Sequence, residues 1–164
     1  HGLFKIRSIS SNTTSALLGS REMGKVDMNR RHQREISQQY ADKFRTKIVS
    51  LDDLIGSLSG GNQQKVVISR ALSTRPKVVI LDEPTRGIDA AARSDVYGII
   101  RQLKEEGVAV LMVSSDIEEV VELADRAITI FQGRINGEFS HDEISQDALT
   151  SASFGIGHER VVAK

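Results

Sequence analysis

Apolar residues in this chain form short continuous runs that alternate with segments of helical periodicity. Two runs, VVIL at residues 78–81 and VAVLMV at residues 108–113, are rich in β-branched residues and predict strands buried on both faces of a sheet. Between them, residues 90–106 have the pattern of a helix that Gly107 ends. Strand, helix and strand in this order indicate parallel strands joined by a right-handed crossover, so an α/β fold is predicted.

A helical pattern precedes these strands. Residues 27–48 predict a helix, because Ile36, Tyr40 and Phe44 recur every four positions with charged residues between them. A short helix or turn is then expected to lead into residue 58.

The last third of the chain predicts a helix, a hairpin and a short terminal helix. The first helix follows residue 116. Gln132 and Gly133 are a hairpin signal between two apolar runs, at residues 127–131 and 134–139. Ser140 and Glu143 have the spacing of a capping box, which predicts the start of the terminal helix.

Residues suited to phosphate binding precede the first strand. The segment LSGGNQQK (residues 58–65) places Ser59, Gly60 and Gly61 at the expected start of a helix. Unpaired backbone N–H groups, a hydroxyl and the positive end of the helix dipole would meet there, which makes an anion site. Glycines let the backbone approach a ligand closely. Taken alone, the same letters also fit an ordinary Ser-capped helix after a glycine turn.

Two acidic residues follow the first strand. Asp82 and Glu83 stand at its carboxyl end, where parallel sheets bind ligands, and Pro84 ends the strand. An Asp there can hold Mg²⁺, directly or through water, and a neighbouring Glu can orient a water for attack on a phosphoryl group. Isolated acidic pairs at strand ends are commonly caps or solvent-facing residues. A phosphate-binding site is therefore indicated only by the two motifs together.

The order of the two motifs resembles that of ATP-binding cassette (ABC) ATPases, in which an LSGG signature precedes a Walker B strand ending in Asp-Glu-Pro-Thr. LSGGNQQK with DEPTRGID (residues 82–89) is similar to the C-terminal half of the duplicated, fused ATPase subunits of bacterial ribose- and galactose-type importers. The likeness covers roughly residues 2–155. It implies a partial ABC-type P-loop NTPase fold: a helical subdomain portion (1–57), an ATPase core portion with a C-terminal hairpin (58–155) and a tail (156–164).

The resemblance also implies roles for individual residues. Cassette halves pair head to tail, so Ser59, Gly60 and Gly61 would touch the γ-phosphate of ATP held by the other half. Asp82 would support Mg²⁺, and Glu83 would act as the catalytic base on this half's own nucleotide.

Three further residues belong to the implied nucleotide site. Gln63 lies in the signature, and Asp89 ends a loop that crosses between the halves, although its letters are GID where ALD is more usual. Ser115 occupies the position where the family places a His against the γ-phosphate. A hydroxyl cannot titrate near neutral pH or carry a positive charge, so the site served by Glu83 is expected to hydrolyse ATP poorly.

A second segment, GSREMGKV at residues 19–26, has the spacing of a P-loop. Its Lys25 precedes Val26 instead of a Mg²⁺-binding hydroxyl, and Gly24 lies only 35 residues before Ser59. We interpret the match as chance. The chain begins with His1 and is expected to be a fragment whose missing part lies upstream, so by itself it should not hydrolyse ATP.

Composition and charge restrict the remaining choices. The 164 residues with 39% hydrophobic content suit one domain with a core, no apolar run approaches membrane-spanning length, and zero Cys excludes disulfides and thiolate metal sites. The formal charge of zero combines a basic segment with an acidic one: residues 1–50 hold 10 Lys and Arg against 4 Asp and Glu. Such a segment could contact nucleic acid, but a solvated helix face is the simpler interpretation.

The resemblance implies a bacterial carbohydrate importer subunit with ATP and Mg²⁺ as cofactors. Its partners would be the N-terminal ATPase half or a second copy, a transmembrane permease and, indirectly, a periplasmic sugar-binding protein. It would lie on the cytoplasmic face of the inner membrane, with no nucleic acid bound. Two alternatives stay open: an ABC ATPase acting on nucleic acid or ribosomes, and a nucleotide-binding regulatory half with little turnover.

Overall fold

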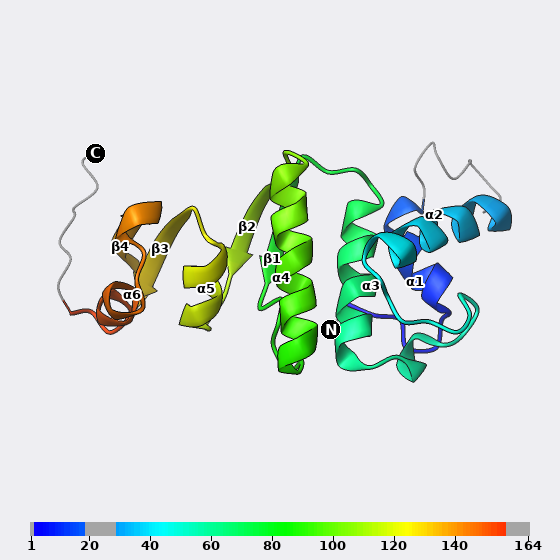
Figure 1. Ribbon diagram of the computed structural model, residues 1–164, viewed down its shortest axis with the longest axis horizontal. Coiled ribbons are helices and arrows are strands. Elements are labelled where there is room, and N and C mark those ends of the chain that lie inside the picture. The colour runs from blue at the N-terminus through cyan, green and yellow to red at the C-terminus, as the bar shows by residue number, and fades with distance from the viewer. Residues whose placement is uncertain (1, 19–28, 157–164) are drawn as a thin grey trace. The chain divides into compact units, whose positions relative to one another are not determined.

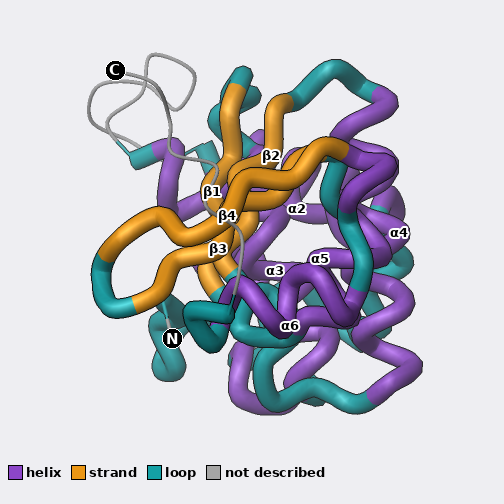
Figure 2. The backbone as a smooth tube through the Cα atoms, turned by 90° about the vertical axis from the view of Figure 1, so that its left-hand side faces the viewer, coloured by secondary structure: helices purple, strands orange, loops and turns teal. Residues whose placement is uncertain are grey.

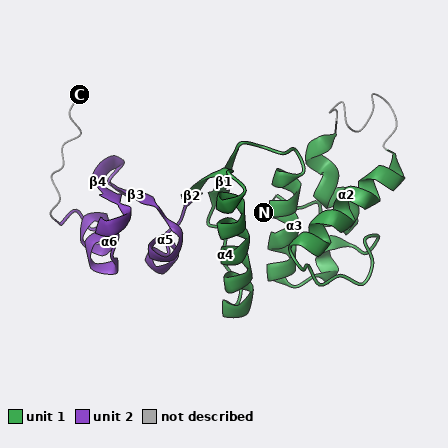
Figure 3. Cartoon of the chain, turned by 45° about the horizontal axis from the view of Figure 1, so that its top comes forward, with its two compact units in different colours: residues 1–112 green, residues 113–164 purple. Residues whose placement is uncertain are grey.

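The computed structural model describes residues 2–18 and 29–156. The chain forms two compact units, residues 1–112 and residues 113–164 (Figure 3). The P-loop-like segment at residues 19–26 lies outside the described residues, as does the end of the predicted tail beyond residue 156.

The first unit is mainly helical. In chain order its helices are α1 (Ile9–Thr14), the 3-10 turn η1 (Ser15–Leu17), α2 (Arg30–Lys43), the 3-10 turn η3 (Ile55–Ser57), α3 (Gly60–Leu72) and α4 (Ala90–Glu105). Strand β1 (Val78–Asp82) pairs with β2 (Ala109–Val113), and α4 connects the two strands. Helices α3 and α4 lie side by side (Figure 1). The strand, helix, strand order confirms the predicted α/β class, and α4 ends where Gly107 adopts a φ of 78°.

Only one face of the β1–β2 pair is covered, which corrects the prediction of strands buried on both faces. Val79 and Leu81 are buried, whereas Val78 and Ile80 are 58% and 68% exposed. Leu111 of β2 is also exposed. A continuous apolar run predicts a strand between two layers, but the described residues supply only one of those layers.

Helix α2 packs on α1 through polar side chains, which the sequence pattern did not predict. Its buried residues are Gln33, Ser37 and Ala41. Of the predicted apolar stripe, Phe44 is buried, whereas Ile36 and Tyr40 are only half-buried. Gln33 Nε2 donates to Thr14 Oγ1 of α1 at 2.9 Å, so the buried polar groups are paired across the interface.

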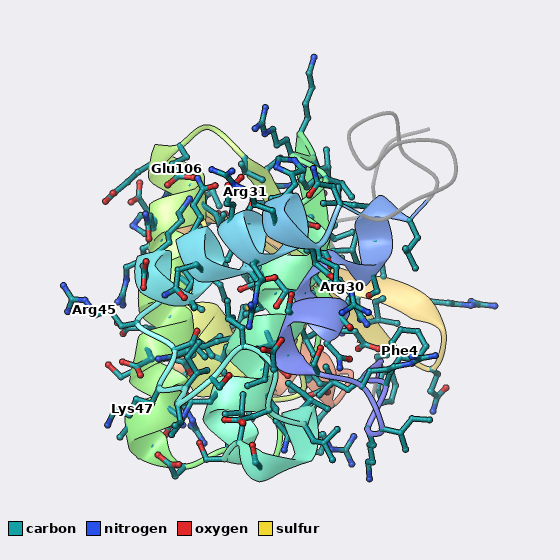
Figure 4. All side chains as sticks on the ribbon, turned by 90° about the vertical axis from the view of Figure 1, so that its right-hand side faces the viewer. Phe4, Arg30, Arg31, Arg45, Lys47 and Glu106 are labelled. Carbon is teal, nitrogen blue, oxygen red and sulfur yellow. The ribbon has the colours of Figure 1, made fainter. Side chains whose placement is uncertain are left out.

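The basic side chains of the first 50 residues that the structure describes lie at the surface. Arg30, Arg45 and Lys47 are exposed (Figure 4). Three other cations form ion pairs with carboxylates: Arg31 with Glu35, Arg34 with Asp52, and Lys43 with Glu106. The hydrogen bond from Arg31 also holds the pKa of the Glu35 carboxyl below its usual value. These pairs favour the interpretation of a solvated face over a nucleic-acid surface.

The second unit is a hairpin covered by helices. Its elements are α5 (Ile117–Leu123), β3 (Arg126–Phe131), β4 (Arg134–Ser140), the 3-10 turn η4 (His141–Glu143) and α6 (Gln146–Ser153). Strands β3 and β4 pair antiparallel (orange in Figure 2), and the turn residues Gln132 and Gly133 have φ values of 47° and 75°. This turn confirms the predicted hairpin signal. Phe139 packs with Leu149 and Ala152 in the core of the unit.

The predicted capping box is present but closes a different element. The backbone N–H of Ser140 donates to Glu143 Oε2 at 3.0 Å, and the box encloses the single 3-10 turn η4. Ile144 then takes an extended ψ of 114°, which interrupts the helical path. The terminal helix starts afresh at Gln146 with Ser145 as its N-cap. Among the described helices, none is both long and apolar enough to cross a lipid bilayer.

Candidate functional site

The turn before α3 exposes the hydrogen-bond donors that the sequence predicted there. Ser59 is the N-cap with φ −61° and ψ 158°, but its side chain makes no capping hydrogen bond to the helix. Its Oγ instead accepts from Nδ2 of Asn62 at 3.0 Å. Because the Ser59 hydroxyl accepts from Asn62, its own proton stays available for donation. Ser59 and the first N–H groups of α3 can therefore donate hydrogen bonds to the same anion. Ser59 and Gly60 are both exposed, as such a role requires.

Asn62 orients this turn, a role that was not predicted from the sequence. Its Oδ1 accepts from the backbone N–H of Lys47 at 3.0 Å while its Nδ2 holds Ser59. The amide therefore connects the segment after α2 with the signature hydroxyl. The three-residue spacing from Ser to Asn was a usable signal, since side chains three apart on a first helical turn meet.

The packing of α3 on α4 leaves no room for a side chain at Gly61. It is buried, and a Cβ added to it would overlap the Cβ of Ala92 in α4. A Cβ on Gly60 would stand 3.6 Å from Ile88 Cγ2, which is ordinary contact. From the sequence, both glycines are expected to allow close approach of the backbone to a ligand. The structure gives Gly61 a second reason, the contact between α3 and α4.

Gln63 points back along the chain. Its Nε2 donates to the carbonyl oxygen of Leu58 at 2.8 Å, which fixes the backbone that enters the turn. Contact between Gln63 and a nucleotide stays a prediction.

Asp82 and Glu83 lie at the carboxyl end of β1, as predicted. Asp82 is exposed and ends the strand. Glu83 has a φ of 47°, a left-handed conformation that costs a non-glycine residue about 1 kcal/mol or more. The Glu83 carbonyl accepts from the N–H of Arg86 at 3.2 Å and closes a turn around the buried Pro84. Arg45 and Arg75 of the same unit also have left-handed φ values, of 48° and 50°, so this conformation alone does not identify a catalytic residue. The catalytic role of Glu83 stays a prediction from its place at the strand end.

The loop from Gly87 to Asp89 lies against the signature turn. Gly87 has a φ of 77°, and a Cβ on Gly60 would be within 4 Å of its carbonyl oxygen. Asp89 is the N-cap of α4, with Oδ1 accepting from the N–H of Ala92 at 2.9 Å. The structure therefore brings the two predicted nucleotide-binding segments together, and Asp89 also has a structural task.

Ser115 lies in the second unit, whereas the other predicted site residues lie in the first. It is exposed and directly precedes Asp116, the N-cap of α5. Asp116 caps that helix by accepting from the N–H of Glu118 at 3.0 Å, and Ser114 Oγ accepts from the N–H of Asp116. The local backbone is thus fixed on the carboxyl side of β2, where the sequence predicted the switch position.

The strand-end carboxylate of Asp82 suits a cation that has only one or two protein ligands. Within the described ranges, no group of three or more His, Asp or Glu side chains converges on a metal position. Mg²⁺ in nucleotide sites takes one or two protein carboxylates and completes its shell with phosphate oxygens and water. Asp82, exposed at the strand end, suits that arrangement.

The family profile described as "ABC transporter" matches residues 3–86, just over half of the chain. The chain belongs to the ABC transporter family. It is similar to the xylose import ATP-binding protein XylG of Moorella thermoacetica, with 46% identity over 116 residues, or 71% of this chain. The chain spans 23% of the length of that relative.

Solved structures share the fold. An ABC transporter of metal-chelate type in an inward-facing conformation has a TM-score of 0.76 at 21% identity, covering 94% of this chain and 60% of its own. The cassette MJ1267 has a TM-score of 0.74 at 24% identity, covering 90% and 63%. The cassette MJ0796, solved as a dimer bound to ADP and Pi, has a TM-score of 0.72 at 22% identity, covering 85% and 59%. The chain therefore forms part of a cassette fold.

Proposed function

We propose that this chain is part of the ATP-binding subunit of a bacterial carbohydrate importer of the ribose and galactose type, in which ATP hydrolysis drives monosaccharide uptake. Membership of the ABC transporter family and the 46% identity to a xylose import ATP-binding protein support this function. The structural observation that carries it is the start of α3, where Ser59 leaves the helix uncapped and is held by Asn62.

The signature turn would serve a nucleotide held by another ATPase half. The N–H groups at the start of α3 and the Ser59 hydroxyl donate to γ-phosphate oxygens, where negative charge is concentrated. Gly60 leaves the approach open because it carries no side chain. The turn therefore completes a site whose P-loop belongs to the partner half.

The strand-end acids would serve this half's own nucleotide. Asp82 would hold Mg²⁺, directly or through water, and the bound ion would supply positive charge beside the phosphates. Glu83 accepts the proton of the water that attacks the γ-phosphorus, while the bond from that phosphorus to the ADP oxygen breaks. The left-handed backbone at Glu83 sets the direction in which its side chain leaves the strand end.

Ser115 supports a second candidate function, a half that binds nucleotide with little turnover. A serine hydroxyl can donate one hydrogen bond to phosphate but cannot supply the charge of a protonated imidazole. In a paired subunit, the site of Glu83 and Ser115 would then turn over slowly while the site completed by Ser59 supports transport.

The partners follow from this function. A transmembrane permease would bind the subunit at the cytoplasmic face of the inner membrane, and a periplasmic binding protein would deliver the sugar to that permease. The other ATPase half, or a second copy, would supply the P-loop that faces Ser59.

Reconstitution of the complete subunit with its permease in lipid vesicles tests the proposal. ATP hydrolysis and uptake of ¹⁴C-labelled xylose, ribose and galactose would be measured with the sugar-binding protein present. We expect hydrolysis coupled to uptake of one monosaccharide. Hydrolysis that nucleic acid or ribosomes stimulate, and that the permease and sugars leave unchanged, would overturn it.

A further inference from the structure

A buried ammonium joins the signature helix to the helix that follows the Walker B loop. Lys65 of α3 has a side chain only 5% exposed, and its Nζ lies 2.8 Å from Oδ2 of Asp95 in α4. The same Nζ donates to the carbonyl oxygen of Arg45 at 3.4 Å. A charge this deeply buried is stable only with such partners, so the three segments are held at one point.

The ion pair continues the contact made by Gly61. Lys65 lies four residues after Gly61 on α3, and Asp95 lies three residues after Ala92 on α4, so both contacts fall on one seam. The contact between Gly61 and Ala92 admits no Cβ, and the contact between Lys65 and Asp95 closes with a charge-assisted hydrogen bond. Together they fix the separation of α3 and α4 (Figure 1).

One end of this seam leads to two groups of the candidate site, because both helices start there. Helix α3 begins at the Ser59 turn, and α4 begins at Asp89. A change in the separation of the helices would therefore move the phosphate donors of the turn relative to the loop that ends at Asp89.

We propose that Lys65, through Asp95, is the positioning residue for the nucleotide site that the Ser59 turn completes. The inference rests on the proposed function, because it concerns the site at which that function occurs. Lys65 does not touch the nucleotide. It holds the donors of the turn where the transition state needs them, and a misplacement of about 1 Å can cost about 100-fold in rate.

Lys65→Met tests this role because methionine keeps the apolar stem and removes the charge. The side chain of Asp95 is already 59% exposed in the intact pair, so its carboxylate stays solvated in the variant. The matched control is Lys43→Met, which breaks the Lys43–Glu106 pair between α2 and the far end of α4. In the complete subunit with its permease, we expect Lys65→Met to lower kcat at least about tenfold with an unchanged KM for ATP. Lys65→Arg should restore most of kcat, and Lys43→Met should leave it unchanged.

A distance measurement gives a readout independent of turnover. This chain has no Cys, so spin labels can be placed at Gly56→Cys before the turn and Ala91→Cys at the start of α4, with any cysteine elsewhere in the subunit replaced by Ser. The label distance distribution should broaden in Lys65→Met and keep its wild-type width in Lys43→Met.

The outcomes separate this inference from the proposed function. A wild-type subunit that neither hydrolyses ATP with the permease nor takes up sugar removes the proposed function, while the label distances still decide whether Lys65 sets the seam. A wild-type distance distribution in Lys65→Met, or equal losses in kcat for Lys65→Met and Lys43→Met, overturns the positioning role. If Lys65→Met does not fold, Asp95→Asn decides by the same measurements: wild-type kcat and distances in that variant overturn the inference.

Discussion

Gly61 of α3 lies directly against Ala92 of α4, with no space for a Cβ between them. Gly61→Ala should therefore lower the free energy of unfolding by about 1–3 kcal/mol, because overpacking forces the helices apart. Gly98→Ala is the matched control, since Gly98 is inside α4 with nothing within 4 Å of its added Cβ, and it should stabilise the chain by about 0.5–1 kcal/mol. Urea unfolding measures both. Equal stability of Gly61→Ala and the wild type would show that α3 and α4 can move apart without loss of stability.

Asn62→Asp should impair the site that the Ser59 turn completes. The carboxylate can still accept from Lys47 but cannot donate to Ser59, and it places a negative charge beside the phosphate donors. ATP turnover of the complete subunit should fall about tenfold or more, as when one transition-state donor is lost. Gln64→Glu adds the same charge two positions along α3 and should have a much smaller effect. Equal losses in the two variants would attribute the effect to charge alone.

Glu83→Gly should stabilise the chain and abolish hydrolysis at its own site. Glycine adopts the φ of 47° without strain, so the midpoint of urea unfolding should rise by the equivalent of about 1 kcal/mol. Glu83→Gln removes only the base and should keep wild-type stability. An unchanged midpoint in Glu83→Gly would mean that the surrounding turn bears no strain at this residue.

Ser59→Arg and Glu83→Gln should differ in severity. A bulky side chain at Ser59 would block the approach of α3 to phosphate at the partner's site, whereas Glu83→Gln would disable a site that, on our proposal, Ser115 already limits. Sugar uptake should nearly vanish in Ser59→Arg and decrease less in Glu83→Gln. Equally severe losses in vesicle uptake would show that both sites must hydrolyse ATP in each cycle.

Ser115→His should raise turnover at the site served by Glu83, because an imidazole can carry a proton and a positive charge near the γ-phosphate. Single-turnover hydrolysis in the complete subunit, with the other site disabled, measures the effect. A rate equal to that of the wild type would show that Ser115 does not limit turnover at this site.

The local elements were readable from the sequence because their causes are local. The run at residues 78–81 formed β1, and Gln132 with Gly133 formed the hairpin turn, since β-branched residues and left-handed turn positions act within a few residues. The LSGG and Asp-Glu motifs were likewise recognised from adjacent letters, and the structure places Ser59 and Glu83 at a helix start and a strand end.

Contacts between distant segments were decided only by the tertiary structure. The polar character of the buried face of α2 was not predicted from the sequence, because Gln33 acquires its partner Thr14 only when α1 packs on it. The capping box at Ser140 was recognised correctly, but the continuation of the chain through Ile144 determined that it closes an isolated turn.

The chemistry of the signature turn divides in the same way. The sequence by itself determined that Ser59, Gly60 and Gly61 begin a helix with exposed donors, because that follows from residue types in order. Only the tertiary structure decided that Asn62 accepts from the backbone N–H of Lys47 and that Lys65 pairs with Asp95 across 30 residues of chain. Hydrogen bonds and steric contacts require particular atoms to meet in space, and a one-dimensional pattern specifies which atoms are available but not which ones meet.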